Sequence, residues 1–313
     1  IFDVFIPSRA PLHAIGMVEF AREVENLSDG TLKITIPSAP MAPPPRLFDM
    51  VEDGIADIAL APVIYAGKRI QLPSITDVFS LADTAPAASV ALWRTYEKYF
   101  EAADEWGGVV PITLFTHGDE HLFVKGKGVD SITSVDGIKV VSPSPLHADR
   151  IKSLGGVPVG GPAIQMFELI NGGVAEAIFV PFGPAMVQGL VGVTDNITTI
   201  PGGISRPAFS VIMNRDVFES LTPKQQDAIM QAGGENLAAK LGAIVEAESA
   251  AGIEAFTKAG ATFTPASTDM VTGLDDRLGF IEENWLKIAE DRGIDGPAAL
   301  AFYRETVAEM EGN

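Results

Sequence analysis

The segment His117-Gly118-Asp119-Glu120-His121 holds the residue types with the widest chemical range in this chain, two imidazoles and two carboxylates. Such side chains bind divalent metals or exchange protons. On an extended strand the two histidines would lie about 13 Å apart, too far to share one ion. A metal site would therefore need a turn within the segment, and we expect no metal here.

Motifs of covalent and cofactor chemistry are absent from the sequence. There is no cysteine, which excludes disulfides, thiolate metal sites and a cysteine nucleophile. No Gly-x-Ser-x-Gly motif occurs, and no serine motif lies beside the four histidines, His13, His117, His121 and His147. A dinucleotide fingerprint and a phosphate-binding loop are also missing. We expect a protein that has no cofactor and leaves its ligand chemically unchanged.

The composition predicts a globular protein with two lobes. The chain has 313 residues, of which 47% are hydrophobic and 20% charged, a content too apolar for disorder and a length that favours two cores over one. Its formal net charge is −19, from 41 acidic and 22 basic residues. Because this field repels phosphate backbones, we expect no nucleic-acid partner, and we interpret the acidity as a solubilising surface.

Several features favour export from the cytoplasm. A chain without cysteine suits an oxidising compartment, although cytosolic proteins also lack cysteine. No apolar run reaches the roughly 18 to 20 residues of a membrane helix. The sequence starts without Met in the strand-like stretch Ile1 to Ile6, as a mature protein does after its export signal is removed. We therefore expect a soluble, secreted protein.

The elements that would position any site alternate between strands and helices. Alternating apolar residues predict strands over residues 1–6 and 32–36, and helical spacing predicts a helix between them, over about 15–24. A second helix over 46–54 and a strand over 55–61 follow, after an irregular proline-rich stretch at 40–45. This order is typical of a doubly wound α/β sheet.

The same pattern restarts in the second half of the chain. A helix around 93–106 and a strand from Val109 to Leu114 lead to a new strand at 139–141, a helix after Leu146 and a strand near 155–159. Thr222-Pro223-Lys224-Gln225 is a helix start with its own cap. We expect one very long helix from there to about Gly260, bent near Gly233-Gly234 and bridging two bodies.

Short segments spread along the whole chain resemble the periplasmic solute receptors of tripartite ATP-independent (TRAP) transporters, of the dicarboxylate-receptor type. They occur in the order of that family and include residues 20–24, 28–30, 51–58, 134–140, 155–158, 171–177, 213–214 and 221–223. Each segment alone is weak evidence for the family. Together, with a long helix after the last of them, they identify the family.

The resemblance implies a two-lobed α/β periplasmic binding protein that captures a small molecule in the cleft between its lobes, closes by hinge motion and carries a long bridging helix. Lobe I would comprise residues 1–118 and 207–246, and lobe II residues 119–206 and 247–313. It also implies periplasmic localisation, a monomer, and delivery of the ligand to integral membrane subunits. A periplasmic enzyme or a sensor on the same fold remains the alternative.

Departures from the family pattern indicate the ligand. Similar receptors carry an arginine where this chain has Val141, and a polar asparagine where it has Val180. Since a buried anion without a cation is costly, the ligand is expected to be an aromatic or other apolar monocarboxylate. The alternative is a small amine or amino alcohol held by Asp119 or Glu120 and an aromatic face.

Ligand-binding residues are expected at the carboxyl ends of strands and in the loops that follow them. Arg9, His121 and Arg206 are the candidates for a cation that replaces the missing arginine. The full set that we predict to bind the ligand is Ser8, Arg9, Pro62, Tyr65, His121, Val141, Ser142, Ile164, Phe179, Val180, Phe182, Arg206 and Phe209.

Overall fold

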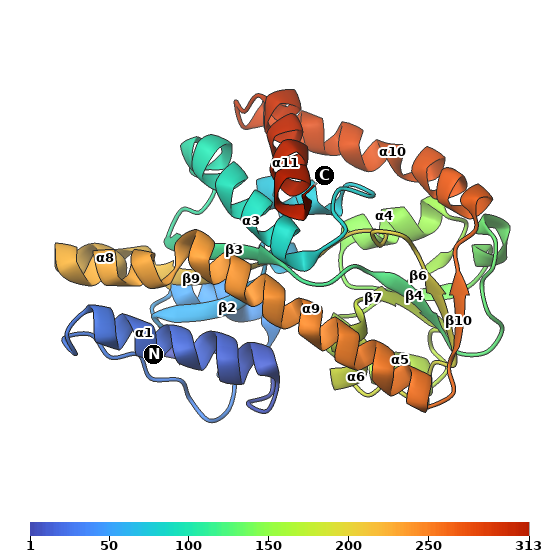
Figure 1. Cartoon of the computed structure of the whole chain (residues 1–313), viewed down its shortest axis with the longest axis horizontal. Coiled ribbons are helices and arrows are strands. Elements are labelled where there is room, and N and C mark those ends of the chain that lie inside the picture. Colours follow the sequence, from blue (N-terminus) through green and yellow to red (C-terminus); the bar gives the residue numbers. More distant parts are fainter. Residues whose placement is uncertain (313) are drawn as a thin grey trace.

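Two β-sheets form the framework of the protein, and long helices run across both of them (Figure 1). The computed structural model describes residues 1–312. Within these residues the first sheet has four strands in the order β1-β2-β9-β3, and the second has six in the order β10-β8-β4-β7-β5-β6. This architecture agrees with the two-lobed α/β fold expected from the sequence.

The first sheet joins strands from distant parts of the chain. Its strands are β1 (Phe2–Asp3), β2 (Ile58–Pro62), β3 (Val109–Thr116) and β9 (Ala208–Asn214). β1 runs parallel to β2, and β9 lies antiparallel between β2 and β3. Around this sheet lie α1 (Val18–Leu27), α2 (Leu47–Glu52), α3 (Ala85–Thr95), α7 (Arg215–Ser220) and α8 (Pro223–Ala232).

The second sheet has β7 near its centre. Its strands are β4 (His121–Val124), β5 (Lys139–Ser142), β6 (Val157–Gly160), β7 (Ala177–Val180), β8 (Asn196–Thr199) and β10 (Thr262–Pro265). β7 pairs with β4 on one side and β5 on the other, so all of its side chains are buried. The connecting helices are α4 (Pro145–Ser153), α5 (Met166–Asn171) and α6 (Phe182–Val187).

The two sheets are connected by two neighbouring segments of chain and by helices. Residues 117–120 link β3 to β4 and lie beside residues 204–207, which lead back to β9; the Glu120 amide donates to the Ser205 carbonyl at 2.9 Å. α9 (Gly234–Lys258) contacts α3 beside the first sheet and α6 beside the second. α10 (Thr268–Asp291) runs along the upper right of the view in Figure 1 and contacts α4 and the helix α11 (Gly296–Glu311). Within residues 1–312 no helix is long and apolar enough to span a bilayer.

Buried apolar side chains form a large cluster that extends along both sheets and two smaller clusters on their opposite faces. The large cluster combines α3 and α2 with α4 and α10, and it contains the three tryptophans Trp93, Trp106 and Trp285. A second cluster lies between the first sheet, α1 and α9. The third packs α5, α6 and the end of α9 against the second sheet. Because the large cluster reaches both sheets, they share part of one core.

Most of the predicted elements are present, and three differ in detail. Residues 32–36 form no strand, although the Thr35 carbonyl accepts a hydrogen bond from the Phe2 amide at 2.9 Å. The strand expected over 1–6 is confined to Phe2–Asp3. The capping box at Thr222 and Gln225 is confirmed, but the single bent helix is wrong, because Gly233 interrupts it and separates α8 from α9.

The proposed lobe boundaries remain a prediction, and the strands divide consistently with them. β1, β2, β3 and β9 belong to the residues assigned to lobe I, and the strands of the second sheet belong to those assigned to lobe II. The C-terminal helix α11 (Gly296–Glu311), grouped with lobe II in that scheme, packs against α3 beside the first sheet (Figure 1).

Gly252 allows α9 to approach α6 closely, and we expect Gly252→Ala to destabilise the protein. A Cβ atom at Gly252 would lie 2.6 Å from the Phe182 carbonyl oxygen. Since backbone cannot move aside easily, the overpacking should cost about 1–3 kcal/mol of unfolding free energy, measured by urea denaturation.

Gly279→Ala is the matched control for this substitution. Gly279 lies in the helix α10, and a Cβ atom there would meet no atom within 4 Å. Its replacement should raise the unfolding free energy by up to about 1 kcal/mol through helix propensity. Equal effects of the two substitutions would contradict the close α9–α6 contact.

Candidate functional site

A cavity of about 150 Å³ lies between the two sheets. One side of its wall comes from the first sheet and the loops beside it, with Phe5, Pro62, Tyr65 and Phe209. The other side comes from β7 and the segments around it, with Met166, Ile178, Phe179, Val180, Pro181 and Pro184. The wall is therefore mainly apolar and contains aromatic rings from both sides.

The apolar wall follows from the positions of its strands. β7 ends at Val180 in the centre of the second sheet, and Pro181 and Phe182 turn the chain directly into α6. Ile178 and Val180 belong to the same buried cluster as Val141, where the sequence led us to expect no cation. On the opposite side Phe209 packs against Phe5, with ring centroids 6.5 Å apart. Val141 is thus packed among buried apolar side chains behind the cavity wall.

Tyr65 connects the two sides of the cavity. It follows β2, and its hydroxyl oxygen accepts a hydrogen bond from the Ala163 amide at 3.3 Å. Ala163 begins the short helical turn before α5, beside the second sheet. Burial raises the pKa of the Tyr65 phenol, which therefore keeps its proton at neutral pH. This contact holds the two sides together at the edge of the site.

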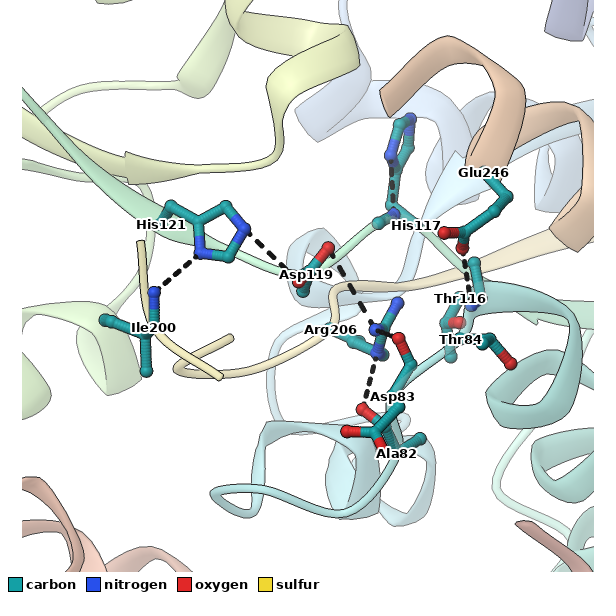
Figure 2. Close-up of polar contacts among 12 residues, drawn as sticks. Ala82, Asp83, Thr84, Thr116, His117, Asp119, His121, Ile200, Arg206 and Glu246 are labelled. Carbon is teal, nitrogen blue, oxygen red and sulfur yellow. Dashed lines mark hydrogen bonds and ion pairs between the residues drawn. The ribbon is translucent and has the colours of Figure 1, made fainter. Parts of the chain in front are cut away.

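His117 places an uncharged imidazole in the cavity wall. Burial lowers the pKa of His117 to about 4, so the ring is neutral at neutral pH. Its Nδ1 accepts a hydrogen bond from the Gly118 amide at 3.0 Å, which assigns the proton of the neutral ring to Nε2 (Figure 2). The ring also packs against Phe209, with centroids 5.5 Å apart. His117 can therefore donate one hydrogen bond.

Arg150 lies behind the cavity at the centre of a buried polar network. Its guanidinium contacts Glu120 at 3.1 Å and Ser205 at 2.9 Å, and it reaches Asp77 beside the first sheet at 3.0 Å. The Ser205 hydroxyl donates to Glu120 at 2.7 Å, and Nε2 of His147 lies 3.7 Å from the same carboxylate. Arg150 thus neutralises a carboxylate of the cavity wall and links α4 to the first-sheet side.

The pKa values of the two carboxyl groups in this network shift in opposite directions. Burial raises the pKa of Asp77, and the charge of Arg150 only partly offsets it. Burial also acts to raise the pKa of Glu120, but the neighbouring His147, Arg150 and Ser205 outweigh it and lower that pKa overall. Glu120 is therefore held as an anion by groups that surround it, and its charge is already balanced.

Glu248 adds a second carboxyl to the cavity wall. It lies on α9, is 6% exposed, and accepts a hydrogen bond from the Leu12 amide at 3.1 Å. Burial raises the pKa of Glu248, and the Leu12 amide offsets this only in part. The backbone of α6 approaches it closely, since a Cβ atom at Gly183 would lie 3.1 Å from the Glu248 Cβ atom.

The structure brings part of the predicted ligand-binding set together. Pro62, Tyr65, Ile164, Phe179, Val180 and Phe209 line the cavity. Three others pack inside the second half of the molecule: Val141 and Phe182 belong to its buried apolar cluster, and the Ser142 hydroxyl donates to the Ser144 carbonyl at 3.0 Å. Ser8 and Arg9 lie in an exposed loop after β1.

His121 and Arg206, two candidate cations, lie at the connection between the sheets and do not line the cavity (Figure 2). His121 accepts a hydrogen bond from the Ile200 amide at 3.2 Å and lies 3.2 Å from Asp119. The Arg206 guanidinium donates to the carbonyls of Ala82 and Asp83, at 3.2 and 2.7 Å. Both side chains are occupied in holding backbone segments together.

The histidine segment that opened the sequence analysis does not gather into a metal site. His117 faces the cavity, whereas His121 is turned toward Asp119 and Ile200. Across residues 1–312, no three His, Asp or Glu side chains are grouped as metal ligands.

The polar residues His147, Gln188 and Glu248 line the cavity and were not predicted from the sequence. Glu248 could have been found, because it is the one charged side chain among the buried residues of α9, which include Leu241, Val245 and Phe256. A buried carboxyl group requires a local reason. His147 and Gln188 give no comparable signal.

Comparisons with known proteins agree on one family. Residues 5–272 match the family described as bacterial extracellular solute-binding protein, family 7 (DctP). The chain is also 28% identical over 300 residues to the outer membrane transporter protein TsaT of Comamonas testosteroni, covering 95% of this chain and 88% of that protein.

Solved structures with the same fold include receptors with bound aromatic acids. A TRAP periplasmic solute-binding protein from Bordetella bronchiseptica with bound (R)- and (S)-mandelate is 29% identical, with a TM-score of 0.94 over 99% of this chain and 98% of that one. A marine metagenome TRAP solute-binding protein in complex with metahydroxyphenylacetate is 25% identical, with a TM-score of 0.89 over 98% of both chains.

Proposed function

Because the chain belongs to family 7 of the bacterial extracellular solute-binding proteins and is a periplasmic TRAP receptor, we propose that its ligand is an aromatic or other apolar monocarboxylate. The apolar cavity between the sheets carries this proposal. A cavity of similar volume in an unrelated protein, lined by aliphatic and aromatic side chains, holds benzene. The cavity of about 150 Å³ found here is therefore suited to one aromatic ring with a short polar group.

The known ligands of related receptors support the same class. Mandelate and metahydroxyphenylacetate each combine one aromatic ring with one carboxylate, and they are bound by two of the structures most similar to this chain. Aromatic side chains from both sides of the cavity, Phe5 and Phe209 on one and Phe179 on the other, could enclose such a ring. We propose Pro62, Tyr65, Ile164, Phe179, Val180 and Phe209 as its contacts.

The charges around the cavity favour one carboxylate over two. Among residues 1–312, no lysine or arginine lines the wall. The carboxylate would be held by neutral donors such as Nε2 of His117 and the amide of Gln188. A second carboxylate would double the cost of removing charge from water without a cation to compensate.

The pairing of the acidic residues argues against the amine alternative. Glu120 is already paired with Arg150 and Ser205, and Asp119 with His121. Asp119 also lies outside the cavity wall. Neither carboxylate is therefore free to hold an ammonium group as the amine hypothesis requires.

Delivery to the transporter completes the proposed function. The open lobes would admit the acid, and closure would exclude water and strengthen each polar contact. The Tyr65 to Ala163 and Asp77 to Arg150 contacts join the two sides of the cavity and would favour the closed form. A monomeric closed receptor would then dock on the integral membrane subunits.

Calorimetric titration with mandelate, benzoate, malate and ethanolamine tests the proposal. We expect binding of the two aromatic acids and no heat from the dicarboxylate or the amine. At a free concentration of about 100 times its dissociation constant, the acid should raise the unfolding free energy by about 2.7 kcal/mol, which thermal unfolding can measure. Binding of ethanolamine or malate in place of the aromatic acids would overturn it.

A further inference from the structure

Glu248 has no ionic partner although it is buried in the wall of the cavity. Its Oε1 accepts from the Leu12 amide, and within residues 1–312 no charged side chain contributes to its electrostatics. The elements packed around it supply little charge. α6 carries no ionisable residue, and His13, on the turn that holds Leu12, uses its Nδ1 for the Ile6 carbonyl at 3.1 Å.

The other ionisable groups of the wall do not compensate Glu248. His117 is neutral at physiological pH, and Tyr65 keeps its phenolic proton. Glu120 is an anion and is already paired with His147 and Arg150. Glu246, two residues away on α9, does not line the cavity. Its carboxylate accepts a hydrogen bond from the Ala85 amide at 3.0 Å (Figure 2).

A carboxylate ligand in this cavity would face an unpaired carboxyl group. If Glu248 were ionised, the two anions would repel each other in an apolar site where charges are weakly screened. If Glu248 is protonated, its free oxygen can donate a hydrogen bond to the ligand carboxylate. Two carboxyl groups that share one proton are a known solution to this problem.

We propose that Glu248 binds the ligand carboxylate in its protonated form, so that capture of an aromatic acid anion takes up one proton from solvent. This inference rests on the proposed function and adds the residue that recognises the carboxylate. Because binding raises the proton affinity of Glu248, affinity is greatest at low pH. It falls as pH rises through the range between the free and the bound pKa of this group.

Titration calorimetry of the whole protein with mandelate, in two buffers of different ionisation enthalpy at the same pH, counts the protons taken up. We expect the wild type to take up close to one proton at neutral pH and its dissociation constant to rise by up to about tenfold per pH unit. Glu248→Gln keeps the shape and can both accept from Leu12 and donate to the ligand. This variant should bind mandelate with little proton uptake and nearly constant affinity.

Glu246→Gln is the matched control, since it removes a carboxylate from the same helix outside the cavity wall. It should retain the proton uptake and the pH dependence of the wild type. Circular dichroism checks that each variant is folded.

The outcomes separate the two proposals. Proton uptake that persists in Glu248→Gln would overturn this inference and assign the proton to another group, such as His117. Binding by the wild type without proton uptake would overturn it as well and leave the proposed function intact. If the wild type bound neither mandelate nor benzoate, the proposed function would fail, and this inference with it.

Discussion

Arg150→Met is expected to lower the unfolding free energy by about 3–5 kcal/mol, as measured by urea denaturation. Arg150 is fully buried and contacts both Glu120 and Asp77. Methionine fills similar space without a charge, so the substitution leaves the buried Glu120 and the partly buried Asp77 without their cation. The burial that already raises the pKa of Asp77 would then act without opposition from the guanidinium.

A matched control and a rescue variant test the cause of this loss. Lys152 lies on the same helix and pairs with Asp149, but both side chains are more than half exposed. Lys152→Met should change the stability by less than about 1 kcal/mol. Glu120→Gln, introduced into Arg150→Met, should recover part of the loss because it removes one of the two stranded charges. A loss for Arg150→Met as small as for Lys152→Met would show that the network contributes little.

Phe182→Ala should also cost about 3–5 kcal/mol of unfolding free energy, because Phe182 is a core residue that does not line the cavity. Its ring packs against Phe123 and His121, with centroids 5.0 and 5.1 Å apart, and against Phe263 at 5.9 Å. Removing it would leave a cavity at the base of α6. Urea denaturation measures the loss.

Phe209→Ala should show the opposite balance of effects. Phe209 is half-buried and lines the ligand cavity, so its removal should weaken binding of mandelate more than it lowers stability. Phe167→Ala, on the surface of α5, should leave both quantities nearly unchanged. If Phe182→Ala weakened binding and left stability unchanged, the assignment of Phe182 to the core would be wrong.

Much of the fold could be predicted because its elements obey local rules. The strands β5 and β7 are short apolar runs between turn residues, and the cap at Thr222 specifies a helix start from four residues alone. Residues 32–36 have the same alternation as a strand. They form none because only the short β1 lies beside them, and one backbone hydrogen bond joins the two segments. Alternation predicts an extended conformation, but pairing depends on the neighbour.

The interruption of the long helix shows a second limit. Two consecutive glycines predict a weak point in a helix, and from the sequence we expected a bend there. In the structure Gly234 adopts a φ of +58°, and the Gly233 Cα lies so close to the Ile112 carbonyl that a Cβ atom would be 2.6 Å from its oxygen. The break depends on contact with β3, which no local rule includes.

The candidate site was predicted in part for a related reason. Residues at strand ends, such as Pro62 and Val180, could be located from the pattern of strands. The direction of the long Arg206 side chain could not be predicted in this way. It depends on the carbonyls of Ala82 and Asp83, more than 120 residues away in the sequence. The cavity wall is mainly apolar, as inferred from Val141 and Val180, but only Val180 belongs to it, and Val141 is packed in the core.

The way in which α9 is held between the sheets limits how the receptor can move. Gly242 seats it against Pro86 at the start of α3, and Gly252 seats it against the Phe182 carbonyl at the start of α6. These two anchor points are about 15 Å apart along one uninterrupted helix. Together with the neighbouring segments 117–120 and 204–207, α9 would oppose sliding and twisting of one half against the other. The two halves would then open by rotation about a single axis. Glu248, which lies on α9 between the two anchor points, would move together with that helix.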